Sequence, residues 1–254
     1  MNILVANDDG IKATGLSRLV ESLSEVAEVY VCAPHTQRSA TGHGITIGKP
    51  IGIKEVKFPK AKLAFEITGL PADCVKVGLK VLEDRKVKID MVFSGINHGG
   101  NLGTDTLYSG TVSAALEGSI CGLPSVAVSV NDHNATHFDT ACRLAVEVCQ
   151  NGSSFLSPDV VLNINTPDLP EEEIRGLKIT RLGRREYKDF FKPKVNQAGE
   201  REYWYQGEPV VYEGLPHDID VISMQDGYAS ITPLHHNMTA NEELDKLEEW
   251  RVNK

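Results

Sequence analysis

The chain has 254 residues, of which 41% are hydrophobic and 24% are charged, and its formal net charge is −9 at pH 7. This length and balance fit one α/β domain of generous size with a buried core. The acidic balance argues against a surface for nucleic-acid duplexes, which needs clustered Lys and Arg, and no apolar run is long enough for a membrane helix.

The N-terminal sequence and the cysteines indicate a cytoplasmic protein. The first ten residues contain neither the basic segment nor the apolar stretch of a secretory signal peptide. The five cysteines are an odd number and form no CxxC pair, so we expect reduced thiols and no structural zinc.

Short apolar runs alternate with helical patterns through the first two-thirds of the chain. The predicted strands are residues 3–6, 29–33, 89–94, 125–130 and 160–164, and the predicted helices are 16–23, 71–82, 110–120 and 137–150. Strands separated by helices of this length predict right-handed crossovers and a doubly wound, mainly parallel, Rossmann-like α/β sheet. Ligands bind beyond the carboxyl ends of such strands, so the residues after each strand are candidates for a site.

The pattern changes in the last third of the chain. Residues 185–220 are polar, aromatic and rich in turn residues without a helical period, which predicts hairpin-like excursions rather than a second domain. A further strand is predicted at 228–234. A terminal helix is predicted at 239–250, with Thr239 and Glu242 in capping-box register.

Two adjacent carboxylates, Asp8 and Asp9, directly follow the first predicted strand. They repel each other, and they lie where the ligand crevice of the sheet is expected. A divalent cation is the simplest way to offset that repulsion. The structural alternative is an Asx turn that caps the following helix.

Polar loops follow two further strands. Residues 33–44 offer hydroxyl, guanidinium and imidazole groups, although a purely connective loop has the same composition. Residues 94–112 are richer, because their glycines let the backbone approach a ligand closely. This segment enters a predicted helix at Ser109, Gly110 and Thr111, where free N–H groups and the positive helix end favour an anion. It matches neither a Walker P-loop nor a dinucleotide fingerprint, and a capped surface loop is the alternative.

Several motifs in this order resemble the SurE family. They are NDDG after the first strand, the AP…S…TG…IT loop, TGLPADCV at residues 68–75, and SGIN-x-G-x-N-x-G followed by YSGTV-x-AA-x-EG. The match is dense over residues 1–130 and thinner beyond. The resemblance implies a metal-dependent phosphatase that hydrolyses nucleoside 5′-monophosphates, with 3′-monophosphates and short polyphosphate as further expected substrates.

The resemblance also implies a site. Asp8, Asp9, Ser39 and Asn97 match the residues that hold one divalent cation per subunit, and such oxygen ligands suit Mg²⁺ or Mn²⁺. Asp8, Asp9 and Asn97 are then the expected catalytic residues. The expected phosphate-binding residues are Asn101, Ser109, Gly110 and Thr111. Two histidines, His98 and His43, are candidates to assist the leaving oxygen.

Other classes of protein also use an acidic pair. A receiver domain needs a phosphoaccepting Asp after a later strand, where this chain has Ser94 and Asn97. A haloacid-dehalogenase-type phosphatase needs a second Asp two residues after Asp8, where Gly10 stands. A non-catalytic nucleotide-binding module would keep the phosphate loop but gives no reason for the adjacent Asp8 and Asp9.

The resemblance further implies dimers or tetramers that form through the C-terminal region. We therefore divide the single domain, residues 1–254, into a catalytic core, 1–184, and an oligomerisation extension, 185–254. We expect a homodimer or homotetramer that takes a small nucleotide as substrate and binds neither a nucleic-acid duplex nor a membrane.

Overall fold

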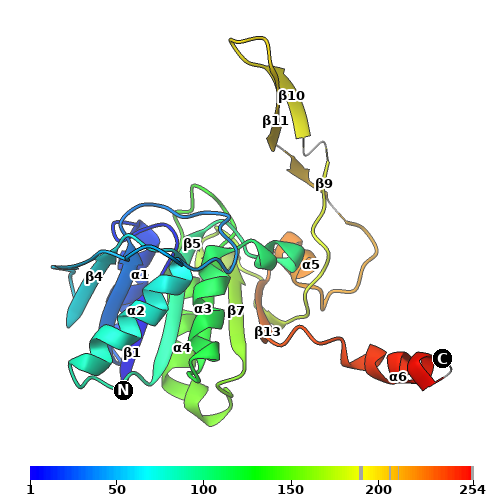
Figure 1. Ribbon diagram of the computed structural model, residues 1–254. Helices are drawn as coiled ribbons and strands as arrows, with labels where there is room; N and C mark the ends of the chain where they lie inside the picture. Colours follow the sequence, from blue (N-terminus) through cyan, green and yellow to red (C-terminus); the bar gives the residue numbers. More distant parts are fainter. Residues whose placement is uncertain (189–190, 206, 211, 253–254) are drawn as a thin grey trace.

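One sheet runs through the described part of the protein in the order β3-β4-β2-β1-β5-β6-β7-β13-β8. Figure 1 shows it in the computed structural model, which describes residues 1–254 except 189–190, 206, 211 and 253–254. At its centre, β1 (Asn2–Ala6) pairs in parallel with β2 (Glu28–Pro34) and with β5 (Met91–His98). The β3–β4 and β7–β13 pairs are antiparallel. The predicted doubly wound, mainly parallel sheet is confirmed.

The remaining elements complete this frame. The other strands of the sheet are β3 (Ile53–Val56), β4 (Leu63–Ile67), β6 (Ser125–Val130), β7 (Val161–Thr166), β8 (Leu177–Ile179) and β13 (Ala229–Leu234). The long helices are α1 (Thr14–Leu23), α2 (Pro71–Asp84), α3 (Gly110–Ile120) and α4 (Asp139–Asn151). The shorter helices are η1 (Gly103–Leu107), η2 (Gly152–Ser154), η3 (Glu171–Glu173), α5 (Asp220–Gln225), η4 (Asn241–Glu243) and α6 (Leu244–Val252).

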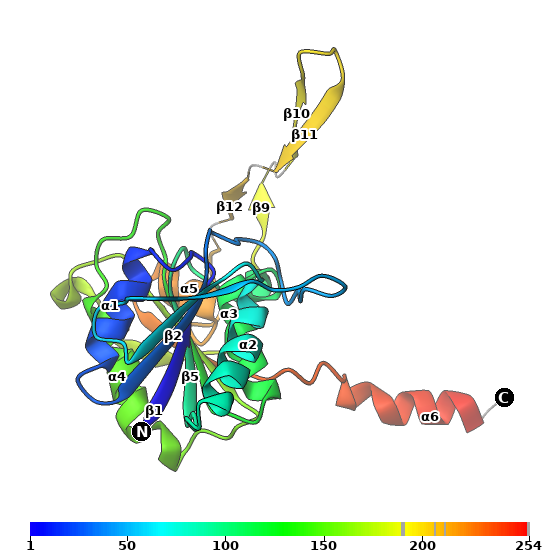
Figure 2. The same cartoon turned by 60° about the vertical axis from the view of Figure 1, so that its left-hand side comes forward.

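Helices cover both faces of the sheet, with α1 and α4 on one face and α2 and α3 on the other (Figure 2). Leu16, Leu19 and Leu23 of α1 are fully buried, because their spacing places them on the helix face that meets the sheet. Each such leucine contributes roughly 2 kcal/mol by leaving water. The continuous apolar run of β1 is buried because both faces of that strand are covered.

The strand predicted at 89–94 continues to His98. Its pairing with β6 shifts register between Ser94 and Asn97, and the strand resumes after this irregularity. Gly95 has φ +136°, and a Cβ there would lie 2.3 Å from the carbonyl oxygen of Val128, so only glycine fits this close approach. Asn97 therefore belongs to the end of the strand rather than to the following loop.

A long arm, residues 183–219, projects from the body after β8 (Figures 1 and 2). It contains two antiparallel pairs, β10 (Phe191–Val195) with β11 (Arg201–Tyr205) and β9 (Tyr187–Lys188) with β12 (Glu208–Pro209). These pairs confirm the predicted hairpin-like excursions. The chain then returns through α5 to β13, which joins the central sheet beside β7. The region after residue 184 thus contributes both a projection and a strand of the core.

The terminal helix begins later than predicted. The capping box at Thr239 is wrong, because α6 starts at Leu244 after the short turn η4. The backbone N–H of Thr239 donates to the side-chain oxygen of Asn237 at 2.9 Å. This local Asx bond holds the chain in a turn at the point where the capping box required a helix to begin.

Most of the cysteines lie in the core. All five cysteines are free thiols, and Cys32, Cys74, Cys142 and Cys149 are buried as small core residues. Within the residues described, none of the helices combines the length and apolarity that crossing a bilayer requires.

Candidate active site

The carboxyl ends of β1 and β5 lie side by side, because the two strands pair in parallel up to Ala6 and Ser94. The winding of the sheet reverses between them, which makes their ends a topological switch point, the place where ligands bind in sheets of this kind. Asp8 and Asp9 follow β1, and Asn97 stands near the end of β5. The sequence and the structure therefore point to the same edge.

Asp8 is buried, with 4% of its surface exposed. The hydroxyl of Thr111 donates a hydrogen bond to Oδ1 of Asp8, and the backbone N–H of Arg38 donates to the Asp8 carbonyl at 2.7 Å. Burial raises the pKa of the Asp8 carboxyl to about 6; the Thr111 hydrogen bond lowers it and the charge of Asp9 raises it. A bound cation would favour the ionised form of this carboxyl.

Asp9 connects three segments of the chain at this edge of the sheet. The side-chain amide of Gln37 donates to Oδ1 of Asp9 at 3.1 Å, and the backbone N–H of His98 donates to Oδ2 at 3.1 Å. Nδ1 of the His98 ring lies 3.3 Å from the same Oδ2. The ring of His98 packs edge-on against Phe138, with 5.4 Å between the ring centroids, and this contact holds the imidazole beside Asp9.

Asn97 and Ser39 are the other two predicted metal ligands. The amide nitrogen of Asn97 donates to the carbonyl of Gly99 at 2.7 Å, which leaves its Oδ1 as the group to bind a cation. Ser39 follows Arg38, whose backbone is bound to Asp8, so the chain brings Ser39 to the same edge. Among the described residues, no hydrogen bond joins the exposed Ser39 to the other three ligands.

The start of α3 approaches the acidic pair closely. Ser109 caps the helix, because its hydroxyl accepts the N–H of Val112 at 3.1 Å. A Cβ at Gly110 would lie 2.7 Å from Cβ of Asp8, so glycine is required for the helix to begin here. The N–H groups of the first turn and the positive helix end suit an anion beside Asp8.

Asn101 has its strongest contacts with the sheet. Its amide nitrogen donates to Oγ of Ser129 and its backbone N–H donates to Oδ1 of Asn165, both at 2.8 Å. Its carbonyl accepts bonds from the side chains of Asn163, at 2.8 Å, and Asn165, at 3.1 Å. These bonds anchor the glycine-rich loop to the ends of β6 and β7. A phosphate contact by Asn101 stays a prediction.

The donor set fits a hard divalent cation. It comprises two carboxylates, an amide oxygen and a hydroxyl, which are the groups that Mg²⁺ and Mn²⁺ prefer. In the described part of the chain, neither Asp8 nor Asp9 forms an ion pair with a Lys or Arg, and the ion-pair partner of Asp9 is His98. The paired negative charge is therefore left for a cation to neutralise. No cluster of three or more His, Cys, Asp or Glu side chains able to hold a metal occurs among the described residues.

Comparison with known proteins identifies the family. The sequence model for "Survival protein SurE" matches residues 3–189. The chain belongs to the SurE family. It is 43% identical over 250 residues to "5′-nucleotidase SurE" of Kosmotoga olearia, covering 98% of each chain. It is 46% identical over 242 residues to the protein of that name from Syntrophomonas wolfei, covering 94% of this chain and 90% of the relative.

A solved structure supports the same assignment. The SurE protein from Aquifex aeolicus superposes with a TM-score of 0.85 at 34% identity, covering 99% of this chain and 100% of that one. The resemblance that the motifs indicated is thus confirmed, and the fold predicted from the alternation of strands and helices agrees with it.

Two features of this SurE site were not predicted from the sequence. Nε of Arg38, a residue whose backbone N–H is bonded to the Asp8 carbonyl, is buried and has no hydrogen-bond partner among the described residues. Asn101 is anchored by Asn163 and Asn165, which alternate with apolar residues in β7. Polar residues at buried strand positions were the only signal that could have identified them.

Proposed function

We propose that this SurE-family chain is a divalent-metal-dependent 5′-nucleotidase, which hydrolyses nucleoside 5′-monophosphates to a nucleoside and phosphate. The observation that carries the proposal is the close approach of the α3 N-terminus to Asp8, because the proposed cation site and the proposed anion site would then lie side by side. The names of the relatives support the nucleotide substrate. Nucleoside 3′-monophosphates and short polyphosphate are further substrates in the proposal.

Asp8, Asp9, Ser39 and Asn97 would hold one Mg²⁺ or Mn²⁺ per subunit. When bound, the cation neutralises the two carboxylates and polarises the phosphoryl group. The amide of Asn97 is already oriented for this role by its bond to Gly99.

The chain's own groups supply the rest of the chemistry. Gly110 and Thr111 present N–H groups to the equatorial phosphate oxygens, where charge must be stabilised during transfer. The N–H of Ser109 is bonded to the Thr106 carbonyl at 3.4 Å, so Ser109 contributes as the cap that holds this first turn in place. The unpartnered Nε of Arg38 adds a donor for the same charge. Asp9 orients the attacking water and accepts its proton, so that hydrolysis is direct.

A proton for the leaving oxygen comes from a histidine in this proposal. Nε2 of His43 lies 2.9 Å from the buried carboxylate of Glu117. This contact holds the loop of residues 33–44 against α3, so the ring of His43 already has a structural partner. His98 lies beside Asp9, at the end of β5. These contacts support His98 over His43 for the role.

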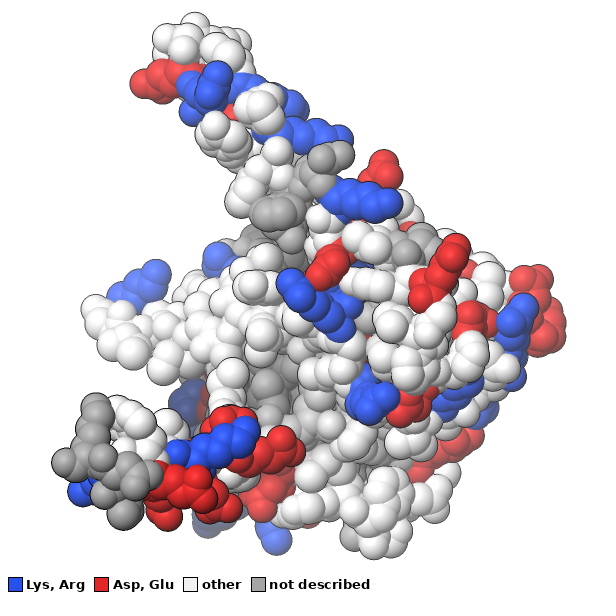
Figure 3. All heavy atoms as spheres, turned by 90° about the vertical axis from the view of Figure 1, so that its right-hand side faces the viewer, with Lys and Arg blue, Asp and Glu red and all other residues white. Residues whose placement is uncertain are grey.

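The assembly and the location belong to the same proposal. The arm and α6 expose apolar side chains, with Trp204 49% exposed and Leu247 58% exposed, and a second copy of the chain would bury them in a homodimer or homotetramer. Both segments stand out from the body in Figure 3, where Lys and Arg side chains gather along the arm. The free cysteines support a reducing, cytoplasmic setting.

The test is hydrolysis by the purified full-length chain. Adenosine 5′-monophosphate and p-nitrophenyl phosphate should release phosphate with Mg²⁺ or Mn²⁺ and release none with EDTA, and a panel of 3′-nucleotides and polyphosphate defines the range. Binding of nucleotide without metal-dependent turnover would favour a binding module and contradict the proposal.

A further inference from the structure

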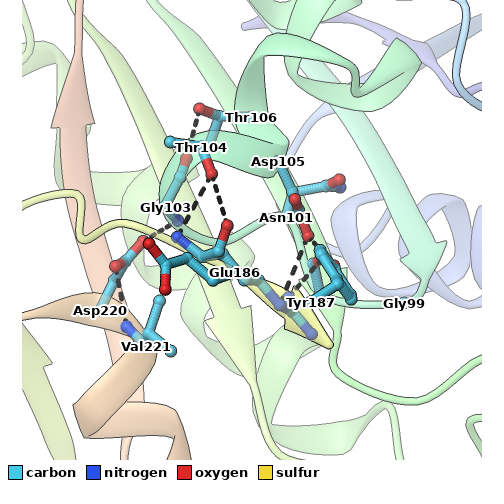
Figure 4. Close-up of polar contacts among 12 residues, drawn as sticks. Gly99, Asn101, Gly103, Thr104, Asp105, Thr106, Glu186, Tyr187, Asp220 and Val221 are labelled. Atoms are coloured by element: carbon cyan, nitrogen blue, oxygen red, sulfur yellow. Dashed lines mark hydrogen bonds and ion pairs between the residues drawn. The ribbon is translucent and has the colours of Figure 1, made fainter. Parts of the chain in front are cut away.

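The foot of the arm, residues 183–187, and the start of α5 are bound to the glycine-rich loop (Figure 4). This loop, residues 99–109, leads into α3. We propose that Asp220 and Arg185 are positioning residues, which hold this loop, and through it the start of α3, where it binds phosphate. The inference rests on the proposed function and extends it, because it makes the foot of the arm a component of the catalytic unit. The functional boundary then lies beyond residue 184.

Asp220 is fully buried at the start of α5. Its Oδ2 accepts the N–H of Gly103 at 2.7 Å, and its Oδ1 accepts the N–H groups of Gly183 and Val221, each at 2.8 Å. A buried carboxylate is costly unless hydrogen bonds replace its water, and these three donors do so. One side chain thereby joins the loop, the arm and α5, as Figure 4 shows for Gly103 and Val221.

Arg185 holds other parts of the same loop. Its Nη1 donates to the carbonyl of Gly100 at 3.3 Å, and its Nε lies 3.4 Å from Oδ2 of Asp105. The Thr104 hydroxyl donates to the Arg185 carbonyl at 3.0 Å and accepts the Arg185 N–H at 3.2 Å. The hydroxyl of Tyr187 also donates to Asp105. The arm therefore contacts the loop at several successive positions.

The loop and the arm are closely packed where they meet. Gly103 has φ +51°, and a Cβ there would lie 2.6 Å from the carbonyl oxygen of Gly183, so the two backbones touch. The beginning of the loop is anchored to the sheet through Asn101. Its end runs into α3, where Gly110 lies against Asp8. A loop released at Gly103 would move the phosphate-binding N–H groups relative to Asp8, and displacements of about 1 Å cost activity.

The variant Asp220→Asn tests the inference. The amide keeps the volume of the side chain, but its NH₂ group must face either the Gly103 N–H or the pair from Gly183 and Val221, so at least one bond is lost. Hydrogen exchange in residues 99–109 should become faster. At saturating Mn²⁺, the KM and the inhibition constant for inorganic phosphate should both rise by about tenfold. The Mn²⁺ concentration for half-maximal activity should change by less than about twofold, because the carboxylate ligands follow β1 and lie outside the loop of residues 99–109.

Asp218→Asn is the matched control. Asp218 lies two positions before Asp220, and its carboxylate is exposed and pairs with Arg181, so the variant removes the same charge without removing a bond to the loop. The rate of hydrogen exchange in residues 99–109 and the phosphate affinity of this control should equal those of the unmodified chain. A second variant, Arg185→Lys, keeps the charge but cannot span Gly100 and Asp105 with one planar group, and it should weaken phosphate binding in the same way. This variant also decides the matter if Asp220→Asn does not fold.

The two proposals fail differently. Turnover by the unmodified chain tests the nucleotidase, whereas exchange in residues 99–109 requires no turnover. Exchange and phosphate affinity equal to the Asp218→Asn control in both folded variants would overturn the positioning role. An activity loss that follows only the folded fraction, with KM unchanged, would also overturn it, because that result is expected of a purely structural residue.

Discussion

The hydroxyl of Thr111 donates a hydrogen bond to Oδ1 of Asp8, although the two residues lie 103 positions apart in the chain. The bond connects the end of β1, where the proposed cation site lies, to the first turn of α3, which is proposed to bind phosphate. Both functions therefore depend on one contact between a strand end and a helix start.

Thr111→Val removes this hydroxyl and keeps the side-chain shape. The Thr111 hydrogen bond lowers the pKa of Asp8, so without it the pKa should rise further above about 6 in the metal-free protein. Mn²⁺ binding, measured by calorimetry from roughly pH 5 to pH 8, should shift to higher pH because the proton competes more strongly. Thr111→Ser retains the hydroxyl and should keep the original pH midpoint; equal midpoints in all three proteins would contradict the assignment.

Asp8→Asn should abolish nearly all turnover while the fold is kept, since one anionic ligand is lost and the charge of the site falls. We expect a loss on the order of 10³-fold at saturating Mn²⁺. Asp84→Asn, which makes the same charge change on an exposed side chain of α2, should be fully active. Near-normal turnover by folded Asp8→Asn protein would sink the metal assignment.

The same substitution should stabilise the metal-free protein. The pKa of Asp8 is raised on folding, so stability from its protonation is present below the ordinary value of 3.8 and is lost as pH rises through about 6. In EDTA at about pH 8, Asp8→Asn should therefore unfold with a free energy roughly 2–3 kcal/mol higher than the unmodified chain. Urea unfolding should show this gap closing as the pH falls, and a gap independent of pH would argue against a buried carboxyl.

Glu117→Gln should destabilise the fold at neutral pH. Burial tends to raise the pKa of Glu117, but hydrogen bonds from His43, at 2.9 Å, and Lys76, at 2.6 Å, outweigh it and leave the pKa below its ordinary value. Its stabilising effect is present above the unfolded pKa and lost as pH falls through the folded one. We expect a loss of about 1–3 kcal/mol near pH 7 that shrinks in acid.

A charge-matched surface pair provides the comparison for Glu117. Asp84→Asn breaks an exposed pair with Lys80 and should cost less than about 0.5 kcal/mol. Equal losses for the two variants in chemical unfolding would show that the Glu117 cluster contributes no more than a surface pair.

Removing the residues after Leu234 should change assembly before it changes catalysis. The truncation deletes α6, a short helix that stands away from the body and needs a packing partner to be stable. It leaves the arm, β13 and the crevice in place. Light scattering at micromolar concentration should give a smaller particle with turnover largely retained. A truncated chain that keeps the full-length mass would remove α6 from the assembly.

Direct hydrolysis predicts the fate of oxygen from solvent. In a single turnover in ¹⁸O-water, the label should appear in the released phosphate and in no carboxylate of the protein. Mass spectrometry of the peptide that contains Asp8 and Asp9 provides the check. Label in either side chain would indicate a covalent aspartyl intermediate and replace the proposed mechanism.

The sequence by itself determined the central strands and helices and the edge of the sheet where the candidate site lies. The apolar run of residues 3–6 and the spacing of Leu16 and Leu19 are local patterns. Strands and helices bury apolar side chains at different sequence intervals, so each type of element can be identified within a short segment. Asp8 and Asp9 are consecutive residues, so the carboxylate pair could be predicted without coordinates.

Only the tertiary structure decided which groups those carboxylates meet. The bond from Thr111 to Asp8, the anchoring of Asn101 by the strand asparagines, and the burial of Asp220 against Gly103 all join residues far apart in the chain. No local pattern encodes such contacts, because a hydrogen-bonding side chain has the same sequence signature in water as in the core. Burial makes the difference, since it is only where water is excluded that an unmet donor or acceptor becomes costly enough to require these particular partners.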